Sequence, residues 1–204
     1  DSLARIEQNG LKINLETLDE IEQEYQKEMD ELEVRLNQLA RDAMGDTPVN
    51  LSSPDDRSVL LYSRRVKDKP SWSRVFNLGH EKRGTTMKPK LRTRMKRGEF
   101  NSAVRNMTDV VYKTRGSQCG SCRGEGRISP LKKDGTLGKA IRICKPCSGT
   151  GVIYVSTGEV AGFKLVPRDP MDTASAGFKT DKVTLENRQT DLSGDAHEFV
   201  TAYV

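Results

Sequence analysis

Four cysteines occupy two copies of one short motif. Residues 119–126 (CGSCRGEG) and 144–151 (CKPCSGTG) both fit Cys-x-x-Cys-x-Gly-x-Gly. Two residues between the cysteines of a pair allow one tight turn to direct both thiolates at the same ion, and two such turns complete a tetrahedron. The glycines suit the positive φ angles and the close backbone approach that these turns need. The pattern therefore predicts one bound Zn²⁺, with the ligands Cys119, Cys122, Cys144 and Cys147.

Other uses of four cysteines fit this sequence less well. Two disulfides would need an oxidising compartment, and nothing in the sequence indicates secretion. A redox dithiol would need only one Cys-x-x-Cys pair. An iron–sulfur cluster can use four cysteines, but glycine-flanked pairs fit zinc better. A zinc enzyme would need an open coordination position and a general base, so we expect a structural ion, with His80 and His197 as ordinary surface residues.

Charge is divided sharply along the chain, although the net charge is only +5. Residues 1–63 hold 6 Lys or Arg and 15 Asp or Glu, whereas residues 64–115 hold 16 and 4. Residues 116–168 are again basic, with 9 Lys or Arg and 3 Asp or Glu, whereas residues 169–204 are acidic, with 3 Lys or Arg and 7 Asp or Glu. A basic centre between acidic ends predicts contact with a polyanion or with an acidic protein surface. The apolar runs are too short to predict a membrane span.

Helical periodicity marks the acidic N-terminal segment. Residues 3–13 predict a short helix that ends at Gly10, and Asn14 is placed to cap a long helix that ends at Gly45 and Pro48. Along the long helix, apolar side chains recur every three or four residues, at Leu18, Ile21, Tyr25, Met29, Leu32, Leu36 and Leu39. Such a stripe is typical of a helix in a hairpin or a coiled coil.

A second helix and a patternless basic stretch follow. Residues 53–56 (SPDD) combine a hydroxyl cap, a first-turn proline and two acids, which predicts a short helix with a buried side at Val59, Leu60 and Tyr62. Residues 66–100 lack a regular pattern, so they fit a flexible arm or a segment that a partner orders, with Trp72 and Phe76 as isolated apolar anchors. Residues 100–112 fit a helix or a strand equally well.

The spacing of apolar residues changes from a helical to a strand pattern around the cysteines. Residues 127–129 and 140–143 flank a polar loop that contains Asp134-Gly135, which predicts a β-hairpin. Residues 152–155 and 163–166 predict two further strands around a turn at Gly158. Helical spacing returns weakly at Val183 and Leu185, and again at Phe199, Val200 and Tyr203. We therefore expect an α+β chain that contains a small β-rich module with one zinc ion.

The cysteine motif resembles the cysteine-rich domain of DnaJ-type co-chaperones. The similarity covers residues 119–151 and is specific at the Cys and Gly positions of both copies. That family carries four copies and two zinc ions, whereas this sequence has two copies and room for one ion, and it contains no J-domain motif. The resemblance implies a metal-binding fold, and it makes a chaperone-like or adaptor module that binds polypeptide the alternative function.

The flanking segments resemble the thumb of family A (polymerase I-like) DNA polymerases. Residues 3–14 (LARIEQNGLKIN) and the long helix after them look like the entry to that thumb. Residues 49–54 (VNLSSP) are similar to the family's Asn-Leu-Asn-Ser-Pro motif, with Ser52 in place of the second Asn, and Asp55-Asp56-Arg57 stands where Lys-Gln-Leu is usual. Residues 177–183 (GFKTDKV) resemble the return of the chain into the thumb.

These matches cover residues 1–65 and 175–204, in the family's order. The resemblance implies a long antiparallel helical thumb hairpin, with residues 66–174 inserted at its tip. A relative from a short-tailed phage carries a processivity-factor-binding insertion at a similar place. Because a thumb contacts duplex DNA mainly along the sugar–phosphate backbone, the family maps DNA contacts onto Asn50, Ser52, Ser53, Lys179 and Thr180. The first three could instead cap a helix.

The basic insertion supplies further candidate DNA contacts. Its densest run is Lys88, Lys90, Arg92, Arg94, Lys96 and Arg97, and each cation that neutralises a phosphate releases counterions. We expect a fragment of a DNA-directed DNA polymerase that clamps double-stranded primer–template DNA, with the insertion on the duplex or on a helicase or processivity factor. The catalytic Mg²⁺ of the parent would lie in a palm outside this fragment, so no residue here is expected to be catalytic. The location implied is intracellular, in a bacterial or phage-infected cytoplasm or an organelle.

Overall fold

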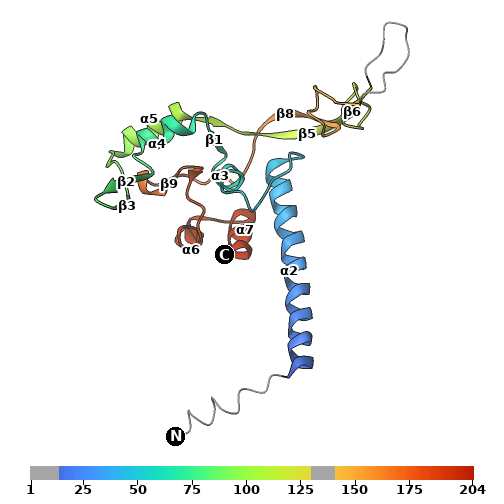
Figure 1. Cartoon of the computed structure of the whole chain (residues 1–204), viewed down its shortest axis with the longest axis horizontal. Helices are drawn as coiled ribbons and strands as arrows, with labels where there is room; N and C mark the ends of the chain where they lie inside the picture. The colour runs from blue at the N-terminus through green and yellow to red at the C-terminus, as the bar shows by residue number, and fades with distance from the viewer. Residues whose placement is uncertain (1–13, 130–140) are drawn as a thin grey trace. The chain divides into compact units, whose positions relative to one another are not determined.

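The structure is a computed structural model that describes residues 14–129 and 141–204. The chain divides into two compact units, Asp1–Gln38 and Leu39–Val204. Figure 1 labels the helices and strands. Short helices alternate with two-stranded sheets in the second unit, which confirms the expected α+β class. The helix expected over residues 3–13 and the Asp134-Gly135 loop lie outside the described residues. Within the described ranges, no helix has both the length and the apolar character that crossing a bilayer requires.

Helix α2 (Leu15–Met44) begins and ends where its capping residues predict. The side-chain oxygen of Asn14 accepts a hydrogen bond from the backbone N–H of Glu16 at 3.1 Å. Gly45 has a φ of +79°, and its N–H bonds to the carbonyl of Arg41, so it closes the helix as a left-handed C-terminal cap. In the described structure the apolar stripe from Leu18 to Leu32 is 43–64% exposed. The helical hairpin that would cover this stripe stays a prediction.

Helix α3 (Pro54–Tyr62) forms the centre of the second unit. The Ser53 hydroxyl caps it by accepting a bond from the N–H of Asp56, as the sequence predicts. Leu60 and Leu61 are fully buried, and Ser63 ends the helix at a φ of +60°. The chain returns to α3 much later, because the N–H groups of Phe163 and Leu165 donate to its last carbonyls. Residues 163–166 are therefore tied to a helix end, and the strand expected there is absent.

An aromatic cluster joins α3 to helices from the basic stretch and to a late strand. Ring centroids lie 4.5 Å apart for Tyr62 and Phe178, 5.5 Å for Phe178 and Trp72, and 4.4 Å for Trp72 and Phe76. Phe100 extends the cluster at 5.8 Å from Phe76. The elements that contribute these rings, besides α3, are α4 (Lys69–Val75), α5 (Arg97–Met107) and β10 (Gly177–Phe178). Trp72 and Phe76 are thus core residues rather than isolated anchors. The ambiguous segment, residues 100–112, is helical as far as Met107 and forms strands from Thr108.

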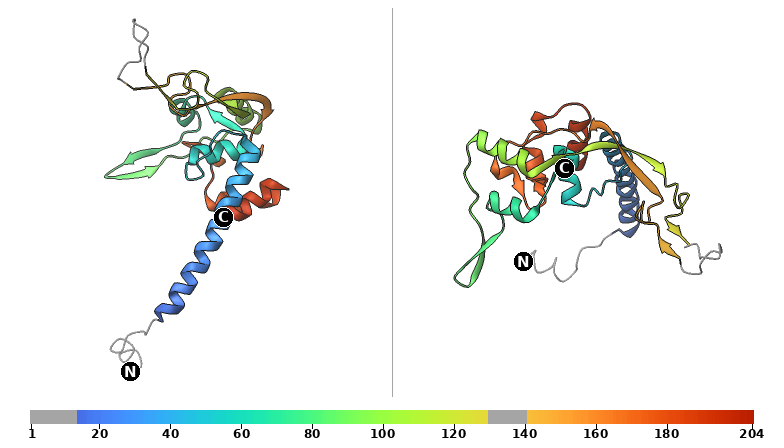
Figure 2. Two further views of the ribbon diagram at one scale, coloured as in Figure 1. Left: turned by 90° about the vertical axis from the view of Figure 1, so that its right-hand side faces the viewer. Right: turned by 90° about the horizontal axis from the view of Figure 1, so that it is seen from above.

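All sheets of the described chain are two-stranded and antiparallel. Their pairs are β1 (Arg64–Val66) with β4 (Thr108–Val110), β2 (His80–Arg83) with β3 (Thr86–Pro89), β5 (Tyr112–Gln118) with β8 (Val152–Val160), β6 (Arg127–Ile128) with β7 (Arg142–Ile143), and β9 (Thr173–Ala174) with β10. The β6–β7 pair confirms the hairpin predicted from residues 127–129 and 140–143. Figure 2 shows β5 and β8 side by side, with the cysteine-bearing turns beyond them.

The turn predicted at Gly158 is wrong. Strand β8 runs through this residue, and its pairing shifts from Tyr112–Val160 to Thr114–Ser156. Between these two pairs β5 advances by two residues and β8 by four, so the strand contains a bulge rather than a turn. Gly158 has a φ of +82°, and no atom lies within 4 Å of where its Cβ would be. Its conformational freedom accommodates the extra residues of the bulge.

Two short helices end the chain, as the spacing of Val183, Leu185 and Phe199 predicts. They are α6 (Lys182–Glu186), capped by the Asp181 carboxylate, and α7 (Asp195–Tyr203), with single 3₁₀ turns at η1 (Pro170–Asp172) and η2 (Gln189–Asp191). The ring of Phe199 is fully buried and packs 5.2 Å from that of Phe163. This contact anchors α7 to the segment that follows β8.

Candidate functional site

The four cysteines lie together at the far end of the β5–β8 ribbon. Their Sγ atoms all fall within 4.8 Å of one another, and all four side chains are buried. The Sγ–Sγ distance is 3.8 Å between Cys119 and Cys144 and 3.6 Å between Cys122 and Cys147. Four sulfurs placed about 2.3 Å from a tetrahedral ion are separated by about 3.8 Å, so the cluster has the size of a metal site with four thiolate ligands.

Backbone bonds to the glycines build the same turn twice. The N–H of Gly126 donates to the Cys122 sulfur at 3.2 Å, and the N–H of Gly151 donates to the Cys147 sulfur at 3.3 Å. The two copies also bond to each other, from Cys119 N–H to the Gly151 carbonyl and from Cys144 N–H to the Gly126 carbonyl. Positive φ angles recur at matching positions, which are Arg123, Gly124 and Gly126 in one copy and Ser148, Gly149 and Gly151 in the other. Each copy of the motif thus specifies the same turn, and the two turns form a locally symmetric pair.

The four buried thiols form the core of the two cysteine-bearing turns. They form a separate buried cluster, and within residues 14–129 and 141–204 Ile153 is the one partly buried hydrophobic residue that packs against it, so little apolar surface holds the turns together. Burial raises the pKa of the Cys144 thiol to about 12. Burial acts the same way on Cys147, but the N–H groups of Gly151 and Gly149 and the adjacent thiols outweigh it and lower that pKa to about 7. A bound cation removes the remaining protons, because thiolates are the ligands.

The donor set is that of a closed structural site. Four soft thiolates in a tetrahedral arrangement favour zinc or an iron–sulfur cluster, and the paired glycine turns favour a single ion. Among the described residues, no other group of three or more His, Cys, Asp or Glu side chains brings its ligand atoms together. His80 and His197 are exposed and lie outside the cluster. The site therefore fits one structural metal ion, with no ligand position left for substrate.

Gly126→Ala should weaken metal binding strongly. The new Cβ would lie closer than 3.0 Å to the Gly149 carbonyl oxygen, at a φ of +69° that alanine rarely adopts. The Cys122 and Cys147 turns would then be pushed apart. We expect at least a tenfold loss of zinc affinity in a chelator competition assay, since about 1.4 kcal/mol of strain already costs tenfold. Gly120→Ala is the matched control, because nothing lies within 4 Å of its Cβ position. Equal zinc affinity in the two variants would contradict the assigned role of the glycines.

The segments around α3 and β10, which hold predicted DNA contacts, meet in space although they are far apart in the sequence. Asn50 bonds through its side-chain oxygen to the N–H of Ser52, and Ser53 caps α3. The Ser58 hydroxyl of α3 accepts a bond from the N–H of Phe178 at 2.9 Å. Lys179 offers its carbonyl to the Tyr62 hydroxyl, whose pKa burial raises to about 12, so that it remains a donor. The structure thus brings Arg57, Ser58 and Tyr62 of α3 against residues 178–180. Asn50 and Ser52 are exposed, and Thr180 is buried.

The basic run divides into exposed and engaged side chains. Lys88 lies on β3, Lys90 follows it, and both are exposed, as is Arg94. Lys96 is the N-cap residue of α5 and is also exposed. In contrast, the Arg92 guanidinium bonds to the carbonyls of residues 170, 171 and 173, and Arg97 bonds to the carbonyl of Arg168. Arg92 and Arg97 therefore hold the fold together in addition to any role toward a partner.

Sequence reasoning did not single out three further cations. One pocket is lined by Arg64, Arg105 and Lys164. In the sequence, Arg105 lies 41 residues after Arg64, and Lys164 lies 59 residues after Arg105. Only the basic balance of residues 64–115 and 116–168 hinted at such a site, because no local motif contains all three. The chain matches no protein-family model, no curated protein and no solved structure. What the protein does must therefore be argued from its geometry and charge.

Proposed function

We propose that the chain is the thumb of a family A DNA polymerase, enlarged by a basic insertion that a structural zinc ion stabilises. The thumb binds the backbone of primer–template duplex, and the insertion extends that contact or binds a replication partner. In this proposal zinc is held by Cys119, Cys122, Cys144 and Cys147, and it supplies structure rather than chemistry. Nucleotide transfer takes place in the parent protein, at Mg²⁺ ions outside these residues.

The observation that carries the proposal is the meeting of the two thumb-like segments. Residues 49–54 and 177–183 resemble two motifs of the family's thumb, and in this chain the helix that follows the first motif contacts the second through Ser58, Tyr62 and Phe178. The Cβ position of Gly177 lies 3.4 Å from the Val66 side chain, so the two ends of the inserted residues 66–174 are adjacent. Such proximity is what an insertion into a loop requires.

The charge distribution supports a contact with the DNA backbone. Lys88, Lys90 and Arg94 are exposed, and no ion pair neutralises them among the described residues. The β2–β3 hairpin that presents the first of these is a narrow antiparallel ribbon, exposed along almost its whole length (Figure 2). Each Lys or Arg that neutralises a phosphate adds affinity that depends on salt but not on sequence. A clamp needs this kind of affinity, because it must slide along any duplex.

Charge reversal tests the clamp. In Lys88→Glu/Lys90→Glu/Arg94→Glu, we expect a 20-bp duplex to bind roughly 10²-fold more weakly at 50 mM salt, and the slope of log K against log salt to fall by roughly 3. Arg92 and Arg97 are left intact because their side chains bond to backbone carbonyls. Fluorescence anisotropy across a salt series measures both quantities. The matched control is Lys27→Glu/Arg41→Glu/Lys182→Glu, which changes net charge equally at exposed helical positions. If both triple variants bind alike, or the unaltered chain does not bind at low salt, the clamp proposal fails.

One observation favours a second candidate, a protein partner at the zinc end. Ile141, Ile143 and Val155 are 58–67% exposed there, which is unusual for apolar side chains beside a structural metal site. A polypeptide-binding adaptor of the DnaJ type would use such side chains. It predicts that the chain binds an apolar peptide with little salt dependence, that Ile141→Ser/Ile143→Ser abolishes this binding, and that duplex affinity is absent from the start. Peptide and duplex titrations on the same preparation separate the two functions.

A further inference from the structure

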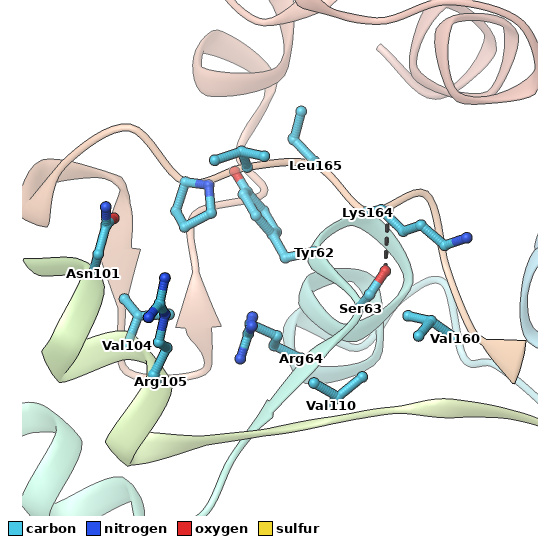
Figure 3. A pocket seen from close by; sticks show the side chains of 12 residues that line it. Tyr62, Ser63, Arg64, Asn101, Val104, Arg105, Val110, Val160, Lys164 and Leu165 are labelled. Atoms are coloured by element: carbon cyan, nitrogen blue, oxygen red, sulfur yellow. Dashed lines mark hydrogen bonds between the residues drawn. The ribbon is translucent and has the colours of Figure 1, made fainter. Parts of the chain in front are cut away.

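A pocket of about 420 Å³ opens beside the end of α3 (Figure 3). Its walls come from three separate places, which are the α3–β1 junction with Arg64, helix α5 with Asn101 and Arg105, and residues 160–167 with Lys164. Figure 3 shows Arg105 and Asn101 rising from α5 on one side, with Arg64 and Ser63 on the other. The described residues that line the pocket include three cations and no carboxylate.

These three charges are not compensated within the described chain. Arg64 donates to the neutral hydroxyl of Thr108 at 3.2 Å, and none of Arg64, Arg105 and Lys164 forms an ion pair with a described carboxylate. Neighbouring cations behave differently, because Lys67 pairs with Asp109 and Lys113 pairs with Glu159. Like charges around one pocket repel each other, and a bound anion would remove that repulsion.

The backbone holds Lys164 at the rim in an uncommon conformation. Its φ is +59°, in the left-handed region that non-glycine residues seldom adopt. Its N–H donates to the Ser63 hydroxyl at 2.9 Å, and the residues on either side of it are bonded to the last carbonyls of α3. Ser63 also has a positive φ, but it ends a helix, where that conformation is common. Lys164 has no such local reason, and strain of this kind gathers at binding sites.

We propose that this pocket binds a phosphate group. Two guanidinium groups can pair with phosphate oxygens through parallel N–H bonds, while the Lys164 ammonium adds charge and the Asn101 amide adds a further donor. The valine side chains of the lining, Val104, Val110, Val160 and Val166, provide an apolar wall against which a sugar can pack. The inference rests on the proposed function insofar as the phosphate belongs to a DNA backbone, and a free phosphate ion has the same chemistry.

A matched pair of double variants tests the site in the full zinc-loaded chain. Arg64→Gln/Arg105→Gln removes two of the three charges, whereas Arg65→Gln/Arg74→Gln removes two exposed charges that do not line this pocket. The first probe is inorganic phosphate at constant ionic strength, read as the shift in the thermal unfolding midpoint. The second is a labelled 20-bp duplex, read as anisotropy at several salt concentrations.

We expect phosphate to raise the midpoint of the unaltered chain and of Arg65→Gln/Arg74→Gln, but not that of Arg64→Gln/Arg105→Gln. We expect duplex affinity to fall roughly tenfold more in the pocket variant than in the control, with a salt slope lower by about 2. Loss of the phosphate shift alone supports the pocket with a free phosphate as its ligand, and loss of duplex affinity alone supports a phosphodiester. If the two variants respond alike to both probes, the pocket is not a phosphate site, whatever the clamp experiment shows.

Discussion

Cys144→Ser should abolish metal binding and unfold the two cysteine-bearing turns, residues 119–126 and 144–151, while the aromatic core stays folded. Three thiolates and a hydroxyl bind zinc poorly, and the metal contributes directly to the folding of such small modules, by about 10–16 kcal/mol in isolated zinc-binding peptides. The turns cannot compensate, because Ile153 is the only partly buried hydrophobic residue of the described chain that packs against the four cysteines. Elemental analysis should find about one zinc per chain in the unaltered protein and none in the variant.

Hydrogen exchange and fluorescence locate the damage. The single tryptophan, Trp72, is fully buried in the aromatic cluster and reports on that region alone. Amides of residues 116–128 and 141–155 should lose protection in Cys144→Ser, whereas Trp72 emission should remain that of a buried indole. Ser121→Ala, an exposed position between two of the ligands, is the control and should keep its zinc. A red shift of Trp72 emission in Cys144→Ser would show that the zinc end and the core fold as one unit.

The metal site could be predicted from the sequence because it is local. Each copy of the motif specifies its own turn, and the only long-range information needed is that the two copies meet. The same holds for the helix ends at Asn14 and Ser53, where a side chain and a nearby N–H decide the outcome. These features depend on neighbours within a few residues, so their spacing is visible in the sequence.

The aromatic core and the basic pocket could not be predicted in the same way. Trp72 and Phe178 are 106 residues apart, and no periodicity relates them. Arg92 looked like one member of a charged run, but its acceptors are carbonyls about 80 residues away. The bulge at Gly158 likewise depends on how β8 pairs with β5, and glycine fits a turn and a bulge equally well. In each case the deciding partner lies far along the chain.

Phe178→Ala should destabilise the second unit by about 3–5 kcal/mol, the usual effect of deleting a fully buried phenylalanine. The Phe178 ring packs against the rings of Tyr62 and Trp72, and the backbone N–H of Phe178 donates to the Ser58 hydroxyl. Urea unfolding followed by Trp72 fluorescence measures the loss, and Phe178→Leu, which keeps most of the volume, should cost less than about 1.5 kcal/mol. Zinc content should be unchanged, because the cysteine cluster has its own packing.

The same variant tests how the insertion is joined to the thumb-like segments. Trp72 belongs to the proposed insertion, residues 66–174, whereas Tyr62 and Phe178 belong to its proposed flanks, so the Phe178 ring adds to the backbone bonds from Phe163 and Leu165 to α3 in joining the two parts. If the insertion folded independently, removing Phe178 would leave the Trp72 transition in place and expose only α3. We expect instead a single unfolding transition at a lower urea concentration. The Trp72 fluorescence should change together with the hydrogen-exchange protection of the Leu60 and Leu61 amides in α3. The basic surface would then be rigidly coupled to α3 and β10, and the clamp proposed above needs this coupling if a contact at the insertion is to slow dissociation of the whole protein.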